Sequence, residues 1–229
     1  MSESAEPTAI RTVERALRLA HIVATTPGGL TLTVAAREAE LALSTAARLL
    51  KALELSGFAW RDSSGLYHAG PRMLQAGAIA LGNLPIYKIA EPHLRDLADY
   101  TGETAYLAVP EGDSHALYLR QVESPRAIRH ATWAGRAIPT VGTAVGAALN
   151  RRLSADGFAT SRRTAVEPEA AAAAAPVYDS TGSVVAALSI IGPSFRISDE
   201  DLESFARAVA KHAQSLSAEL GYPGAWPRS

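Results

Sequence analysis

Four residues in the first quarter of the 229-residue chain have side chains suited to nucleic acid: Ser44, Thr45, Arg48 and Lys51. On a helix that begins near Ser44 they share the outer face. Reading the major groove requires small or polar residues at the exposed start of a helix, because bulky groups would hold the backbone away from the bases. Ser44 and Thr45 meet this requirement, the planar Arg48 guanidinium suits guanine or phosphate, and Lys51 suits phosphate.

Five further residues extend this prediction to phosphate contacts. Arg61, Ser63 and Ser64 lie in a hairpin-like stretch, and Arg11 and Arg15 lie in a first helical pattern. Phosphate contacts fix the register of a protein on DNA and make binding salt-dependent, whereas base contacts supply sequence choice. For any one of these residues, a solvated surface position is the better interpretation. The ordered set favours DNA binding.

The charge balance limits how strongly one copy of the chain could bind DNA. Basic and acidic residues nearly cancel up to Leu84, so Glu38, Glu40 and Glu54 must point away from the phosphates. A monomer with so few cations should bind feebly. A dimer doubles the contacts and sets two half-sites about one helical turn, roughly 34 Å, apart.

Three helices and a hairpin are predicted around these residues. The first helix begins near Thr8, with one apolar face, and ends at Pro27. The second covers 31–41, with Thr31 or Thr33 as N-cap. The segments FAWR and LYHA, joined by DSSG, predict the hairpin. The first apolar face comprises Val13, Ala16, Leu17, Ala20 and Ala24, and that of the third helix Ala46, Leu49, Leu50 and Leu53. We therefore predict a winged helix-turn-helix over residues 8–70.

The rest of the chain divides into a linker helix over 71–84 and an α+β domain over 85–229, separated at Pro85. The second domain should contain a helix ending near Gly102, strands ETAYLAV and HALYLRQV, and a further strand at IRHATWAG. A helix over 143–152, a hairpin of AAAPVYD and SVVAALSIIG, and a last helix after Ser198 complete it. Strands flanked by helices at both ends suggest a sensor-like domain.

Composition and motifs exclude several classes of functional site. The formal net charge is −1 and there is no Cys, so disulfides, thiolate metal sites and a Cys nucleophile are excluded. The six His residues show no metal-site spacing, and neither a P-loop nor GxSxG occurs. We expect no cofactor, no metal and no enzyme activity. No signal peptide or membrane span is expected, and a cytoplasmic location fits.

Segments in a fixed order carry a resemblance to the IclR family of bacterial transcriptional regulators. They are VERALRLAHIVA, LSTAARLLKALELSGF, GLYHAGPRMLQAG, TGETAYLAV, VESPRAIR, GRAIPTVGTAVGAAL, AAPVYDSTGSVVAALSIIGP and SAELGYP. The resemblance implies a winged helix, a linker helix that dimerises and a C-terminal effector domain of GAF-like fold. It also implies dimers or tetramers, palindrome-like promoter sites, and control by small organic acids or aromatic metabolites.

The chain departs from the family pattern at several places. Leu43 and Ala47 stand where the family commonly has a basic residue and a His, so more of the recognition depends on Ser44, Thr45 and Arg48. Glu40 replaces the family's Gly before the turn. The stretch between Gly146 and Ala174 is shorter than usual, and we expect it to lack a helix.

An effector pocket is predicted in the second domain. The turn Gly142-Thr143-Ala144 precedes a helix and could supply N–H donors to a carboxylate. Ser189 matches a ligand-binding position of the family, whereas Ile191 and Ala172 replace polar residues. These losses favour an aromatic or aliphatic ligand over a glyoxylate-sized acid. The further pocket candidates are Tyr106, Leu107 and Trp133. The alternative is that Ser189 is a satisfied core hydroxyl and Gly142 only starts a helix.

The sequence therefore predicts a ligand-responsive, DNA-binding transcriptional regulator without enzyme activity. We favour a repressor of a metabolic operon that binds a palindrome-like operator as a homodimer or homotetramer. The alternative is a metabolite-binding or assembly module whose winged helix mediates protein contacts.

Overall fold

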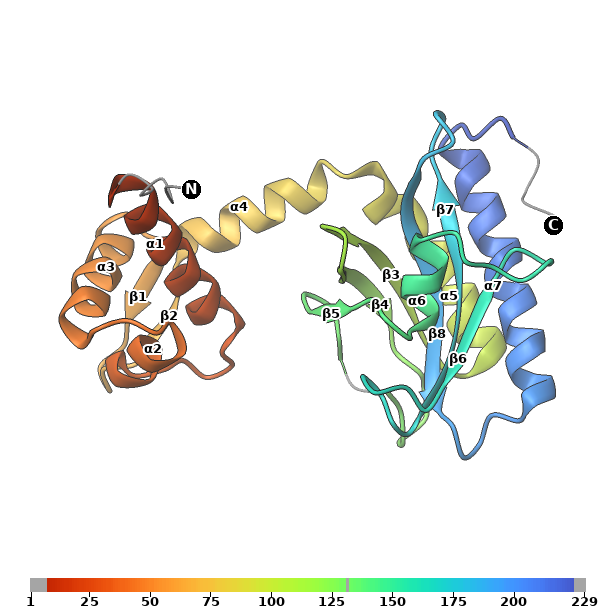
Figure 1. Ribbon diagram of the computed structural model, residues 1–229, viewed down its shortest axis with the longest axis horizontal. Coiled ribbons are helices and arrows are strands. Elements are labelled where there is room, and N and C mark those ends of the chain that lie inside the picture. Colours follow the sequence, from red (N-terminus) through yellow and green to blue (C-terminus); the bar gives the residue numbers. More distant parts are fainter. Residues whose placement is uncertain (1–7, 131, 225–229) are drawn as a thin grey trace, which may run out of the picture. The chain divides into compact units, whose positions relative to one another are not determined.

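The computed structural model describes residues 8–130 and 132–224, which form two compact units, called unit 1 and unit 2, divided between Asn83 and Leu84. Figure 1 shows helices and a short hairpin in the first unit, and a curved sheet with helices on both faces in the second. The predicted α+β class with an N-terminal winged helix-turn-helix is confirmed. None of the described helices has the length and apolar character needed to cross a membrane.

Unit 1 is a winged helix. Its helices are α1 (Thr8–Thr25), α2 (Leu32–Glu38), α3 (Leu43–Leu55) and α4 (Pro71–Gly82), and its wing pairs β1 (Ala59–Arg61) with β2 (Tyr67–Ala69) in antiparallel register. Thr31 caps α2 by accepting the Val34 N–H at 3.3 Å, as expected. The predicted inward face of α3 is confirmed for Ala46, Leu49 and Leu50, which are buried.

The predicted buried face of α1 is wrong in part. The residues that pack inward are Ala16, Leu19, Ala20 and Val23, at the spacing of one helical face, whereas Val13 and Leu17 are 58% and 64% exposed. Helix α1 carries two apolar stripes, and only one of them meets α2, α3 and the wing. Its second stripe, Ile10, Val13 and Leu17, remains open on the surface of the unit.

Unit 2 is built on one antiparallel sheet of six strands in the order β5-β4-β3-β8-β7-β6. The strands are β3 (Thr104–Glu111), β4 (His115–Val122), β5 (Ala137–Pro139), β6 (Ala159–Arg162), β7 (Ala170–Tyr178) and β8 (Val184–Pro193). Helices α5 (Pro85–Thr101) and α7 (Asp199–Glu219) cover one face of the sheet, and α6 (Ala144–Leu149) covers the other (Figure 1).

Alternation along the central strands separates two cores. On β8, Ala186, Leu188 and Ile190 pack with α5 and α7, whereas Ala187 and Ile191 pack with α6. The alanine run of β7 alternates in the same way, and its small side chains let helices approach both faces closely. The predicted strand in this run is confirmed, despite the helix propensity of alanine.

Two expectations in unit 2 are corrected. The described part of Ile128–Gly135 contains no strand, and the edge strand β5 begins only at Ala137. Helix α6 is shorter than the helix expected over 143–152. It begins at Ala144, with Thr143 as its N-cap, and it ends at Leu149. The last helix begins after Ser198, as predicted, and a capping box joins Ser198 to Asp201. No helix occurs between Leu149 and Ala170, a stretch that is described throughout.

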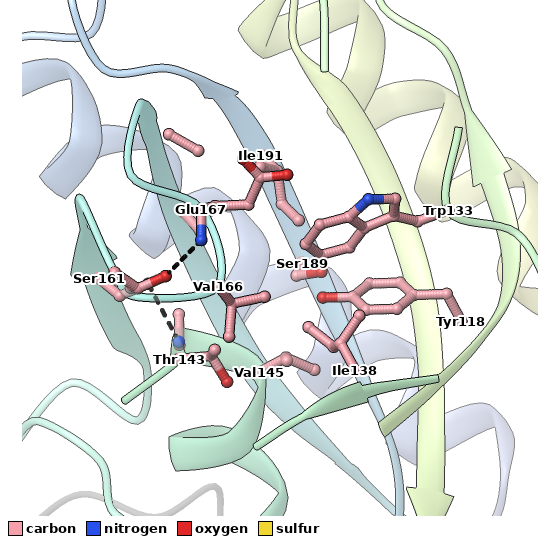
Figure 2. A pocket seen from close by; sticks show the side chains of 14 residues that line it. Tyr118, Trp133, Ile138, Thr143, Val145, Ser161, Val166, Glu167, Ser189 and Ile191 are labelled. Atoms are coloured by element: carbon pink, nitrogen blue, oxygen red, sulfur yellow. Dashed lines mark hydrogen bonds between the residues drawn. The ribbon is translucent and has the colours of Figure 1, made fainter. Parts of the chain in front are cut away.

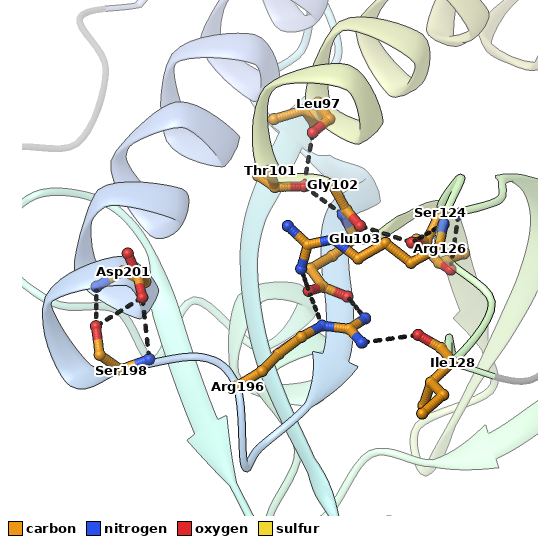
Figure 3. Close-up of polar contacts among 11 residues, drawn as sticks. Leu97, Thr101, Gly102, Glu103, Ser124, Arg126, Ile128, Arg196, Ser198 and Asp201 are labelled. Carbon is orange, nitrogen blue, oxygen red and sulfur yellow. Dashed lines mark hydrogen bonds and ion pairs between the residues drawn. The ribbon is translucent and has the colours of Figure 1, made fainter.

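A buried carboxylate joins three parts of unit 2. The Glu103 side chain is 1% exposed and receives two hydrogen bonds from Arg196, at 2.7 and 2.6 Å, and one from Arg126 at 2.9 Å (Figure 3). Arg196 also donates to the Ile128 carbonyl at 2.7 Å. The cluster therefore holds the start of β3, the loop after β4 and the segment before α7 together.

Candidate functional site

The turn between α2 and α3 sets the position of the exposed helix α3. Its backbone closes through hydrogen bonds from Glu40 N–H to Arg37 O and from Leu41 N–H to Ala36 O. Glu40 has φ 55°, a left-handed conformation that favours glycine. Helix α3 then begins at Leu43 without a side-chain cap, since Ala42 occupies the N-cap position.

The outer face of α3 carries the residues predicted for DNA. Ser44, Arg48 and Lys51 are exposed, Thr45 is half-buried, and Arg48 has no ion-pair partner among the described residues. Glu54 pairs with one of these cations, since its carboxylate lies 3.3 Å from the Lys51 ammonium. Arg48 is therefore the more available of the two cations.

The wing is a rigid hairpin held by its own polar groups. Asp62 accepts the Ser64 and Leu66 N–H groups at 2.9 Å, and its carboxylate lies 2.8 Å from His68 Nε2. The hydrogen bond with His68, followed by that of the Leu66 amide, lowers the pKa of Asp62. Ser63 and Ser64 are exposed at the tip.

Arginines of the wing and of α1 complete the basic residues predicted for DNA. Arg61 is exposed but anchored, since it donates to the Gly65 carbonyl at 3.1 Å and lies over the Tyr67 ring. Arg11 and Arg15 are exposed and share a helical face with Arg18, which donates to the Ala39 carbonyl beside the α2–α3 turn. The fold therefore places these α1 arginines on the helix face that borders this turn.

Unit 2 contains a small cavity between the sheet and α6 (Figure 2). It lies on the sheet face opposite α5 and α7. It is lined by Tyr118, Trp133, Ile138, Thr143, Ala144, Val145, Ser161, Thr164, Val166, Glu167, Ala170, Ala172, Ser189 and Ile191.

Six of the nine residues predicted for an effector pocket line this cavity: Trp133, Thr143, Ala144, Ala172, Ser189 and Ile191. Three do not. Leu107 faces the core under α5 and α7, because neighbouring residues of β3 point to opposite faces. Tyr106 packs behind Trp133, and Gly142 only forms the turn before α6, with φ 75°.

The start of α6 does not offer the free donors expected for a carboxylate. The Ala144 N–H donates to Ser161 Oγ at 3.1 Å, and the Gly146 N–H donates to Thr143 Oγ1 at 3.1 Å. The Thr143 hydroxyl donates in turn to the Thr140 carbonyl at 2.9 Å. Side chains of the protein thus satisfy the groups that were predicted to bind an anion.

Ser189 is the least satisfied polar group among the residues that line the cavity. Its side chain is buried, and Oγ has no hydrogen-bond partner of normal geometry among the described residues. The Tyr118 hydroxyl points towards it (Figure 2), and burial raises the pKa of this phenol, an effect that the nearby Ser189 opposes. A buried hydroxyl without a partner is costly, so a ligand that bonds it would be stabilised.

Glu167 brings a carboxylate to the cavity from the loop between β6 and β7. Its Oε1 lies 3.0 Å from His130 Nε2, and His130 Nδ1 lies 2.6 Å from the Tyr106 hydroxyl. His130 is buried, and its ring packs edge-on against Trp133 at 4.5 Å. Burial raises the pKa of Tyr106, so its phenol is neutral and can donate to the imidazole.

Sequence reasoning missed eight of the lining residues: Tyr118, Ile138, Val145, Ser161, Thr164, Val166, Glu167 and Ala170. Alternation along β4 places Tyr118 on the same face as Ala116 and could have indicated it. Glu167 and Thr164 lie in a loop, where no periodic pattern gives the direction of a side chain. The described residues contain no group of three or more His, Cys, Asp or Glu arranged to hold a metal ion.

A winged helix with an exposed polar recognition face, joined to a separate α+β unit with a cavity, defines a DNA-binding regulator of two parts. The family described as "IclR helix-turn-helix domain" matches residues 12–63, and "Bacterial transcriptional regulator IclR C-terminal" matches residues 78–156 and 151–218. The chain belongs to the IclR family of bacterial transcriptional regulators, and the resemblance stated from its sequence is confirmed.

Named relatives support this assignment. The chain is 30% identical to the HTH-type transcriptional regulator BhcR of Paracoccus denitrificans (strain Pd 1222), over 91% of this chain and 86% of that protein. It is 27% identical to the HTH-type transcriptional repressor AllR of Escherichia coli (strain K12), over 95% and 94% of the two chains. These relatives are regulators and not enzymes, in agreement with the expected absence of catalysis.

A solved structure of this family has the same architecture. An IclR transcriptional regulator from Alicyclobacillus acidocaldarius aligns with a TM-score of 0.76 at 26% identity, over 91% of this chain and 98% of the other. The two matches of the C-terminal family overlap at 151–156, within the stretch between Gly146 and Ala174 that was expected to be shorter than usual.

Proposed function

We propose that this protein is a ligand-responsive repressor of a metabolic operon that binds a palindrome-like operator as a homodimer or homotetramer. The observation that carries the DNA part is the outer face of α3, which presents Ser44 in its first turn and, one turn further on, an exposed Arg48 that has no ion-pair partner among the described residues. Relatives named as repressors support the sign of regulation. We place it in the cytoplasm, where its DNA lies.

Open apolar surface on unit 1 supports a dimer. Ile10, Val13 and Leu17 of α1 are 47–64% exposed, and Leu74 and Ile79 of α4 are 65% and 56% exposed. No residue of α4 is buried. A helix with this apolar surface is expected to be covered by a partner, and a second copy would also double the phosphate contacts.

Regulation would follow from a shift between two arrangements of the dimer. A ligand in the cavity of unit 2 would favour one arrangement, and the linker helix α4 would pass the change to the spacing of the two α3 helices. A ligand can move this equilibrium only by the difference in its affinity for the two arrangements.

Fluorescence anisotropy with labelled DNA from upstream of the protein's own gene tests this function. Wild-type protein should bind, and its affinity should fall steeply as salt rises. Arg48→Ala should weaken binding by about tenfold or more, while Arg95→Ala, an exposed arginine of α5 paired with Glu91, should not. Salt-insensitive binding, or no binding to any duplex, would favour the assembly module.

A further inference from the structure

We infer that the cavity of unit 2 takes an uncharged ligand with an apolar body and an amide-like or hydroxyl end, and that Glu167 excludes carboxylates. This inference rests on the proposed function, because it names the ligand class of the effector site. Its physical basis is the charge and hydrogen-bonding capacity of the lining residues.

The charge of the cavity is negative. Glu167 is the only carboxylate that lines it, and no Lys, Arg or His does so among the described residues. A neutral His130 protonated on Nε2 would leave this negative charge in place, because that tautomer donates to Glu167 at 3.0 Å and accepts the Tyr106 hydroxyl proton at 2.6 Å. Beside this form of the pair, a ligand carboxylate would meet an uncompensated like charge.

The backbone offers an anion little compensation. The Ala144 and Gly146 amides at the start of α6 already donate to Ser161 and Thr143. The remaining side-chain donors are hydroxyl groups and the indole N–H of Trp133, which serve a neutral acceptor as well as a charged one. Among the described residues, the lining therefore lacks the cation that usually holds a carboxylate.

The polar end of a neutral ligand has a matching partner. Ser189 is 1% exposed, lines the cavity and has no hydrogen-bond partner of normal geometry among the residues described. The Tyr118 hydroxyl points towards the same spot (Figure 2). Each hydroxyl can both donate and accept, so together they suit an amide, an alcohol or a phenol, which also does both.

The rest of the lining suits an apolar body. Trp133, Ile138, Val145, Val166 and Ile191 supply ring and branched surfaces, and Ala170 and Ala172 add small side chains from β7. A ligand that placed its apolar part against these residues would be held without charge, beside a Glu167 side chain that is 31% exposed.

Two pairs of probes with the same shape test the inference: benzamide against benzoate, and isobutyramide against isobutyrate. Binding to the full-length protein is measured by calorimetry at neutral pH. At least one amide should bind at millimolar concentration or below, and the matching carboxylate should bind at least about tenfold more weakly. Glu167→Gln should reduce this preference by about tenfold, because the like charge is removed. Ser189→Ala should weaken binding of the amide without restoring binding of the carboxylate.

Glu169→Gln is the matched control, since Glu169 is exposed two residues away and does not line the cavity. It should keep the wild-type preference. DNA binding is measured in parallel, so a failure of the proposed function is seen separately. The inference is overturned if a carboxylate binds as tightly as its amide, if neither amide binds, or if Glu167→Gln leaves the preference unchanged. The wild-type comparison holds even if a variant fails to fold.

Discussion

Two groups of charged residues, the outer face of α3 and the Glu103 cluster, show how the same residue types serve different ends. Arg196 uses its guanidinium on two Glu103 oxygens and the Ile128 carbonyl, all within unit 2. Arg48 on α3 is exposed and has no ion-pair partner in the described part of the chain. A cation whose hydrogen bonds are satisfied internally stabilises the fold, whereas one left open is available to DNA.

The same comparison can be made between two carboxylates, Glu103 and Glu167. Glu103 is held by two arginines, whereas the Glu167 carboxylate, among the described residues, contacts an imidazole at 3.0 Å. The buried acid with two cationic partners therefore supports the fold, and the acid without an arginine lines the cavity of unit 2.

The largest effect is expected where the charges are most completely paired. Arg196→Ala leaves the 1%-exposed Glu103 carboxylate short of its main partner, which should lower the free energy of unfolding by about 3 kcal/mol or more. Arg207→Ala is the control. Arg207 also contacts two carboxylates but is 66% exposed, so its loss should have little effect. Urea denaturation measures the free energy of unfolding of both variants. Equal losses of stability would contradict the distinction between the buried and the exposed arginine.

Arg48→Ala should show the opposite pattern. Its loss should reduce operator affinity by about 1–3 kcal/mol per copy, while stability stays within about 0.5 kcal/mol of wild type. Anisotropy titrations at several salt concentrations, together with urea denaturation, measure both quantities. If stability falls instead and DNA binding persists, Arg48 is a structural residue like Arg196.

The sequence was sufficient for the parts of the fold that follow from local patterns. The spacing of Ala46, Leu49 and Leu50 identified the inner face of α3, and the DSSG turn identified the wing. Helix α1 shows the limit of this reasoning. Its two apolar stripes have equally good periodicity, and only tertiary contacts decide that Leu19 is buried while Leu17 is exposed.

The residues that line the cavity were predictable only where a strand or a turn fixes the direction of their side chains. Ser189, Ile191 and Ala172 alternate with core residues on β8 and β7, and the structure places all three at the cavity. Glu167 reaches the cavity from a loop, where its carboxylate contacts His130, a residue far away in the sequence. No local pattern contains that information, and the same holds for the use of the α6 amides by Ser161.

A smaller effect is expected at the turn that positions α3. Glu40 has φ 55°, and its only ion pair within the described part of the chain is an exposed contact with Arg18 at 3.7 Å. Glu40→Gly should remove backbone strain and raise the free energy of unfolding by about 0.5 kcal/mol after the added entropy of the unfolded chain. Glu38→Gly, in the helical backbone of α2, should lower it. Urea denaturation of both variants gives the signs, and a loss of stability in Glu40→Gly would contradict the strain argument.

The smallest expected effect concerns the cation on α3 that is already paired. Glu54→Gln should free Lys51 and remove a negative charge beside the recognition face, so operator affinity should rise by about 1.5-fold to twofold. Part of this gain comes from Lys51 itself, so Glu54→Gln should gain less in a Lys51→Ala background. Anisotropy titrations of the four proteins give this coupling. If the gain is the same in both backgrounds, Lys51 does not contact the DNA, and Arg48 is left as the principal cation of α3.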